Sequence, residues 1–182
     1  MTKDTLELLL HPIRIRIVNA FSGNRSRTTS EVCRRLPDVS QATVYRHVAL
    51  LAEAAVLVVV DEQVVRGAVE RHYRLDRERA RLDPQAAAEM TLDDHRRAFT
   101  AAMAALIADF GAYLNSGTAA PTEDRIGYRQ IPVWLTDTEH DELVKGLQKI
   151  LAPLMRRGPQ SDRRQYLLSP IVFPVAEAAA NR

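Results

Sequence analysis

Residues 29–58 constrain the fold more than any other part of the chain, because they hold two short amphipathic helical patterns with a tight break between them. The first pattern has apolar residues four positions apart. The second has Val44, Val48 and Leu51 at i, i+4 and i+7, a spacing that gathers them on one face of a helix. The break is the tripeptide 37–39, which begins with proline. Two such helices joined by a short turn predict a helix-turn-helix unit.

The opposite face of the second helix carries amide, hydroxyl and guanidinium groups. Ser40 occupies the N-cap position, where its hydroxyl can accept a hydrogen bond from a backbone N–H of the first turn. We expect this helix to span residues 40–54 and to present its polar side to base edges and phosphates. The alternative is a solvated polar face without a partner. The candidate DNA-binding residues on this helix are Ser40, Gln41, Thr43, Tyr45 and Arg46.

These side chains have the chemistry that base recognition needs. The amide of Gln41 can pair with adenine through two hydrogen bonds, and the guanidinium of Arg46 can pair with guanine or a phosphate. Thr43 and Tyr45 can make polar or methyl contacts. His47 fits two interpretations equally well, a partly buried structural histidine or a phosphate donor.

The segment also resembles a known family. Residues 40–47, followed by the apolar run 50–57, look like the recognition helix of ArsR-type winged-helix transcriptional regulators. Residues 11–17 are similar to that family's first core helix, and residues 66–75 look like the wing of its larger members, which carry a C-terminal extension. The resemblance covers roughly residues 5–80. It implies a winged-helix domain that binds DNA.

The periodicity changes after the second helix and predicts a β-hairpin. Leu57 begins a β-branched run, residues 69–74 alternate, and Gly67 supplies a permissive backbone at the tip between them. Arg66 at this tip has no role in a core. We therefore predict that Arg66 contacts the DNA backbone or the minor groove.

Charge is distributed unevenly along the chain. Residues 1–82 hold 14 Lys/Arg against 10 Asp/Glu, net +4, whereas residues 83–182 hold 11 against 13, net −2. The positive half contains the helix-turn-helix pattern, which is the sign expected for a surface that faces phosphates. Arg25 and Arg27 could also touch phosphate, although a solvated loop is an equal alternative. The net charge of +2 for the whole chain is too small to indicate nonspecific binding through bulk charge.

A long helix is predicted from a capping box at Thr91 and Asp94 to about Asn115. Its large apolar residues follow heptad spacing, and alanines on its flanks would let another helix approach closely. The predicted dimer seam consists of Phe99, Met103, Leu106, Phe110 and Tyr113. The alternative is that this stripe packs on the chain's own core. We favour the dimer because the first ~80 residues supply their own apolar faces and two-fold dimers are the commonest assembly.

The remaining residues, 118–182, predict a small strand–helix–strand module. Residues 128–135 alternate as in a strand, and a capping box at Thr136 opens an amphipathic helix that Pro153 kinks or ends. Residues 164–175 predict a second strand, which its prolines confine to an edge or break. The aromatic residues that could line a small-molecule pocket, or form the ordinary core of the module, are Tyr128, Trp134 and Tyr166.

Metal, cofactor and catalytic chemistry find little support. Cys33 is the only cysteine, so it lacks the paired cysteine that metal sensors of the resembled family use, and we interpret it as a small core residue. Residues 93–95 supply half of a helix site, but Leu106 stands where a second histidine would be needed. The histidines are scattered, and no phosphate loop, nucleophile elbow or metalloprotease motif is present. We expect no metal, no cofactor and no enzymatic activity.

The composition, 46% hydrophobic and 26% charged, is typical of a globular protein. No run of apolar residues approaches the ~18–20 that a membrane span needs, and the N-terminus does not have the form of a signal peptide. We therefore expect a cytoplasmic protein that does not enter a membrane.

Together these patterns predict a mostly helical α+β protein in three parts. They are a winged helix-turn-helix domain over residues 1–82, a connector and dimerisation helix over 83–117, and the C-terminal module over 118–182. The expected function is that of a sequence-specific transcriptional regulator, most simply a repressor, which binds double-stranded DNA at an inverted-repeat operator as a homodimer. Two alternatives remain: a sensor whose C-terminal module binds a small-molecule effector, and a winged-helix protein-interaction module that does not read DNA.

Overall fold

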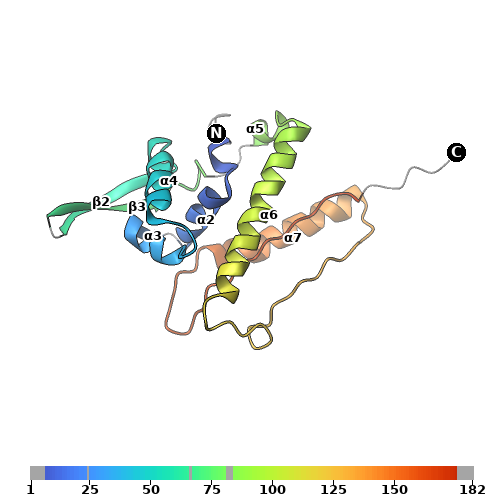
Figure 1. The fold of residues 1–182 in the computed structure, drawn as a ribbon. Coiled ribbons are helices and arrows are strands. Elements are labelled where there is room, and N and C mark those ends of the chain that lie inside the picture. Colours follow the sequence, from blue (N-terminus) through green and yellow to red (C-terminus); the bar gives the residue numbers. More distant parts are fainter. Residues whose placement is uncertain (1–6, 24, 66, 81–83, 176–182) are drawn as a thin grey trace.

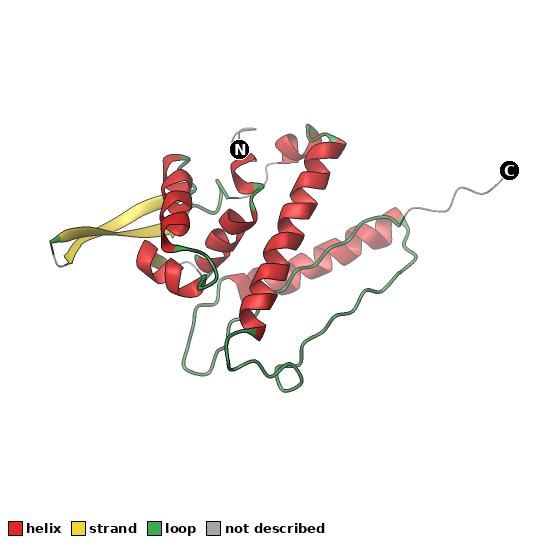
Figure 2. Cartoon of the chain, viewed as in Figure 1, coloured by secondary structure: helices red, strands yellow, loops and turns green. Residues whose placement is uncertain are grey.

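A computed structural model describes residues 7–23, 25–65, 67–80 and 84–175 (Figure 1). They form helices and one small antiparallel sheet, so the fold is α+β (Figure 2). In chain order the elements are α2 (Pro12–Ala20), β1 (Ser26–Thr28), α3 (Thr29–Arg35), α4 (Gln41–Glu53), β2 (Leu57–Val65), β3 (Ala68–Leu75), α5 (Pro84–Ala88), α6 (Leu92–Leu114) and α7 (Asp137–Met155).

Side-chain caps determine where the helices begin. At α2, His11 Nδ1 accepts a hydrogen bond from the Ile13 N–H at 3.2 Å, and Pro12 takes the first helical position, where its missing N–H leaves no bond unmade. The starts of α6 and α7 predicted from capping boxes are confirmed. The N-cap of α3 is Thr28. The three capping boxes pair Thr28 with Glu31, Thr91 with Asp94, and Thr136 with Glu139.

The core lies where the apolar faces of α2, α3 and α4 meet the sheet. The face of α4 predicted to point inward is buried, and the turn between α3 and α4 falls at the predicted break. The helix-turn-helix arrangement expected from the sequence is therefore present. The buried apolar residues of this core are Ile17, Ala20, Phe21, Val32, Leu36, Val44, Val48, Leu51, Val56, Leu57 and Tyr73.

The sheet has three antiparallel strands in the order β1-β3-β2. The predicted hairpin is present as β2 and β3, with Gly67 near its tip at a φ of +83°, which suits glycine. The strand β1 was not predicted. Its Arg27 is buried and its Nε donates to the Ala20 carbonyl at 2.7 Å, so both interpretations offered for this residue, a phosphate contact and a solvated loop, are wrong. Arg25, just before the strand, is exposed.

The long helix α6 packs against α2 through small residues. Ala101 and Ala105, which were expected to make room for a partner helix, are buried within the subunit. Asp109, one further turn along, is paired with Arg16 of α2 at 2.6 Å. By length and composition alone α6, with a mean hydropathy of 1.2, is long and apolar enough to cross a membrane. Its charged first turns and its ion pair with α2 are features of a helix packed on a protein core.

The predicted strand–helix–strand module is wrong in its two strands. The helix is present as α7, but residues 128–135 and 164–175 form no strand. A strand needs a neighbouring strand for its backbone N–H and C=O groups, and these two segments have none within the described residues. Prolines in both segments remove further donors. In Figure 1 the chain leaves the lower end of α6, loops outward and enters α7 at the end farthest from the sheet.

Candidate nucleic-acid interface

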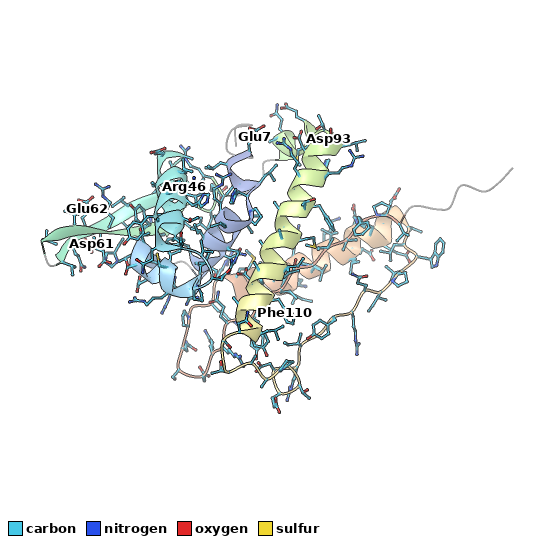
Figure 3. The ribbon with its side chains drawn as sticks, in the orientation of Figure 1. Glu7, Arg46, Asp61, Glu62, Asp93 and Phe110 are labelled. Carbon is cyan, nitrogen blue, oxygen red and sulfur yellow. The ribbon has the colours of Figure 1, made fainter. Side chains whose placement is uncertain are left out.

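The exposed face of α4 carries most of the residues predicted to contact DNA. Gln41 and Arg46 are exposed, and Tyr45 is 53% exposed although Val44 and Val48 of the same helix are buried. At the start of the helix, Ser40 Oγ accepts a hydrogen bond from the Thr43 N–H at 3.3 Å and lies 2.8 Å from Thr43 Oγ1. These two hydroxyls therefore support the cap, whereas Gln41, Tyr45 and Arg46 present their polar ends outward. Figure 3 labels Arg46 on this helix.

An open groove of about 550 Å³ separates α4 from the hairpin and extends to the start of α3. Tyr45 stands on the α4 side of the groove, and Arg71 and Glu70 stand on the hairpin side. A groove flanked by an exposed helix and a projecting hairpin can receive a ridge such as a sugar–phosphate strand. The full lining is Thr29, Ser30, Tyr45, Val48, Ala49, Val65, Val69, Glu70, Arg71 and Tyr73.

The hairpin contributes little net positive charge. Residues 57–75 contain three acidic and three basic side chains. Asp61 and Glu62 lie on β2 (Figure 3), and Glu62 accepts a hydrogen bond from Arg71 Nε at 2.8 Å. Arg66, predicted to contact DNA at the tip, lies outside the described residues. The exposed guanidinium group on the helix beside this hairpin is that of Arg46.

Arg16 connects the helix-turn-helix turn to α6. It is only 4% exposed, and its two terminal nitrogens donate to the carboxylate of Asp38 at 2.6 and 2.7 Å. Its Nε donates to Asp109 on α6 at 2.6 Å. Hydrogen bonding from Arg16 holds the pKa of Asp38 below its usual range. Sequence reasoning missed this residue, although an arginine inside an apolar helical pattern was a signal for a buried ion pair.

His47 is buried, which agrees with its interpretation as a structural histidine. Only 3% of it is exposed, and its ring packs against that of His11 with centroids 4.6 Å apart. Burial, together with the neighbouring charges of His11, Arg14 and Arg46, lowers the pKa of His47 to about 4. The imidazole is therefore neutral near pH 7.

The residues of the predicted dimer seam lie along one side of α6, and three of them contact later parts of the same chain. Phe99 meets Phe173 edge to face, with ring centroids 6.2 Å apart. Phe110 contacts Tyr128 in the same way at 5.9 Å, and Tyr113 donates a hydrogen bond to Asp124 at 2.6 Å. Figure 3 labels Phe110 toward the end of the helix. Further large apolar residues of α6 remain exposed beside the seam: Leu92, Ile107 and Leu114.

The aromatic residues of the C-terminal part form neither a pocket nor a core within one subunit. Tyr128 and Tyr166 are each 70% exposed, and Trp134 is 93% exposed. Both interpretations from the sequence are therefore wrong for the single chain, because the strands that would have brought these rings together are absent.

Potential metal ligands are dispersed. Among the residues that the structure describes, no three His, Cys, Asp or Glu side chains come together. Cys33 is half-buried against the core, and burial raises the pKa of its thiol.

Comparison with known families agrees with this geometry. A family model described as a helix-turn-helix domain matches residues 9–60, which include α2, α3, α4 and the first residues of β2. No curated protein matches the chain. The chain thus contains a helix-turn-helix domain of the kind that DNA-binding regulators use, and α4 is the second helix of that motif.

Proposed function

We propose that the protein is an ArsR-like winged-helix transcriptional regulator that reads a specific DNA sequence and acts as a repressor. The observation that supports the proposal is the amphipathic character of α4. Gln41, Tyr45 and Arg46 lie on its exposed face, and its opposite, apolar face is buried in the core. This helix lies within the residues that the helix-turn-helix family model matches. Helices of this kind lie in the major groove and use their first turns to read bases. The hairpin β2–β3, which follows α4 along the chain, would serve as the wing. This function requires no catalytic group, metal or cofactor, and its place of action is the cytoplasm.

We further propose that the regulator is a homodimer. The single chain exposes 13,890 Å², whereas a compact monomer of its mass exposes roughly 8,800 Å². The excess of about 5,000 Å² per chain is more than the roughly 1,000–2,500 Å² that each subunit of an obligate homodimer buries, so a dimer interface can be formed from part of it. It is concentrated on one side of α6, on α7 and on the two extended segments, where Ile107, Ile150 and Phe173 are 72%, 63% and 64% exposed. A two-fold dimer presents two copies of α4, so its operator is an inverted repeat with half-sites about one helical turn apart, or a multiple of ~10 base pairs.

Binding measurements on operator variants test this proposal. Gln41→Ala should relax the preference at one base position and cost ~1–3 kcal/mol there. Arg66→Ala should weaken binding to all sequences alike and lower the salt slope by about one unit, as expected for a phosphate contact. Gln148→Ala, on exposed α7, serves as the control and should change neither property. A protein that shows no preference among duplexes, or a Gln41→Ala variant with unchanged preference, would contradict the proposed reading of DNA by α4.

A further inference from the structure

Four basic side chains meet between the start of α2 and the middle of α4. His11 and His47 are in ring contact at 4.6 Å. Burial lowers the pKa of His11, and the charges of Arg14 and Arg46 lower it further. The pKa of Arg14 is likewise lowered, first by burial and then by Arg46. These four side chains therefore form one basic cluster, in which Arg14 and Arg46 carry the positive charge near pH 7 and the two imidazoles are neutral.

No carboxylate balances this cluster in the part of the chain that the structure describes. Several other guanidinium groups among the described residues are paired with acids, as Arg16 is with Asp38 and Arg71 with Glu62. Burial acts first on the pKa values of His11, Arg14 and His47, and the charged neighbours that add to its effect are all basic. The guanidinium groups of Arg14 and Arg46 thus influence each other without a counter-charge, and an anion would balance them.

Unpartnered polar atoms point to the same conclusion. Both ring nitrogens of His47, which is 3% exposed, lack a hydrogen-bond partner, and so does the buried Nε of Arg14. The contact of Arg14 Nη2 with the Glu7 carbonyl is long, at 3.4 Å. A buried donor without an acceptor is costly, so the unpaired Nε of Arg14 favours a ligand that brings acceptor atoms to this place.

The start of α2 supplies the geometry for an oxyanion. Because His11 Nδ1 accepts the Ile13 N–H, the proton of the neutral ring is on Nε2, which is then a hydrogen-bond donor. The N-terminus of the nine-residue helix adds the positive end of its dipole. Arg14 and Arg46 add guanidinium donors, which suit phosphate oxygens.

We propose that His11, Arg14 and Arg46 form a phosphate-binding site that holds the DNA backbone beside α4. Arg46 belongs to the exposed face of α4, so the site lies next to the surface that would read bases. His47 supports the His11 ring from within the core. This inference rests on the proposed DNA-binding function, and it adds α2 to the contacts that the sequence assigned to α4 and the hairpin tip.

Two substitutions and one charge-matched control test the site. Arg14→Gln removes the guanidinium. His11→Asn removes the imidazole donor but keeps a side chain that can cap α2. Lys145→Gln removes the same charge from exposed α7. Melting temperatures are measured without DNA in sodium phosphate and in sodium chloride of equal ionic strength, and binding to operator and random duplexes is measured across a salt series.

The expected result has three parts. Phosphate raises the melting temperature of the wild type and of Lys145→Gln, but not that of Arg14→Gln. Arg14→Gln and His11→Asn bind both duplexes more weakly by similar factors, and Arg14→Gln lowers the salt slope by about one unit. In chloride, Arg14→Gln is at least as stable as the wild type, because it removes an unbalanced cation. A residue that only held the fold together would instead show a loss of stability.

Other outcomes overturn the inference. An Arg14→Gln variant that keeps the phosphate shift and the wild-type slope shows that the cluster binds no phosphate. A lost phosphate shift with an unchanged slope assigns the cluster to a free oxyanion and overturns the DNA backbone as its ligand. If the wild type does not bind DNA at all, the proposed function fails. In that case only the melting temperatures in phosphate and chloride test the site. If Arg14→Gln loses the increase in melting temperature that phosphate causes, the cluster is an oxyanion site; if the variant keeps this increase, the site is overturned.

Discussion

Ala55 adopts a backbone conformation that L-amino acids avoid. Its φ is 54°, at a cost of roughly 1 kcal/mol for a residue with a Cβ atom. It follows the C-cap of α4 and completes a Schellman motif, in which its N–H donates to the Ala52 carbonyl and the Val56 N–H donates to the Leu51 carbonyl, each at 2.9 Å. Ala55→Gly should therefore raise the free energy of unfolding by about 0.5–1 kcal/mol. Urea denaturation midpoints measure the change.

The neighbouring residue provides the control for this substitution. Ala54 has a φ of −78°, which suits alanine, so Ala54→Gly should lower stability or leave it unchanged. If both glycine variants lose stability to the same extent, backbone strain at Ala55 is not the cause.

His47 makes the stability of the fold depend on pH. Its folded pKa of about 4 lies below the ordinary value of 6.5, so between these two values the unfolded chain binds a proton that the folded protein does not. The free energy of unfolding should therefore decrease as the pH falls from 6.5 to 4, by at most roughly 1.4 kcal/mol per unit. Burial also lowers the pKa of His11, which adds to the effect in the same direction.

Denaturation of two histidine variants at pH 7 and pH 5 separates this effect from general acid sensitivity. His47→Leu should reduce the loss of stability between the two values, because the proton uptake of the unfolded chain at this position is removed. His140→Gln, at an exposed position of α7, should show the wild-type loss. Equal losses in both variants would show that His47 does not control the pH dependence.

At the scale of elements, the starts of the helices could be predicted from the local sequence, whereas the contacts between elements could not. Caps such as Thr91 and Thr136 act within one turn, so a single segment contains all the information about where its helix begins. The position of Arg27 depends instead on a carbonyl at the end of α2 and on pairing between β1 and β3. Neither interaction leaves a periodic signal in residues 26–28.

The ion pair between α2 and α6 should matter more than its single hydrogen bond suggests. Asp109→Ala leaves the Nε of buried Arg16 without an acceptor, so it should lower the free energy of unfolding by about 1–3 kcal/mol. Arg16 keeps its two bonds to Asp38, so the turn between α3 and α4 should remain in place. Thermal or urea denaturation measures the loss.

The comparison for this prediction is an exposed ion pair on α7. Asp141 and Lys145 lie 3.9 Å apart with side chains 68% and 75% exposed, so Asp141→Ala should cost less than about 0.5 kcal/mol. A cost for Asp109→Ala no greater than that for Asp141→Ala would show that the buried pair does not tie α6 to the helix-turn-helix core.

At the scale of the whole molecule, the sequence predicted buried apolar surfaces that remain exposed in the single chain. Alternation over residues 128–135 and the heptad stripe of α6 are both patterns of buried surfaces. In the single chain Trp134 is nevertheless 93% exposed and Phe99 of the stripe is 49% exposed. Sequence patterns report that a side chain is to be covered but not which chain covers it. The same limit applies to the candidate site: the polar face of α4 follows from periodicity, whereas the cluster with α2 depends on how two helices pack.

The proposed dimer leads to a prediction at this scale. Ile150 lies on the apolar face of α7 and is 63% exposed, so Ile150→Glu should cost the single chain little while placing a charge in the dimer interface. Ile107→Glu on α6 should act in the same way. Both variants should sediment as monomers at micromolar concentration and should bind an inverted repeat far more weakly than the wild type, because one subunit contacts only one half-site.

Lys149→Gln, the neighbour of Ile150 on the polar face of α7, changes the net charge by the same amount and should remain dimeric. Circular dichroism establishes that each variant is folded before its mass is measured. A wild-type protein that sediments as a monomer, or glutamate variants that remain dimeric, would show that the exposed apolar surface has another purpose.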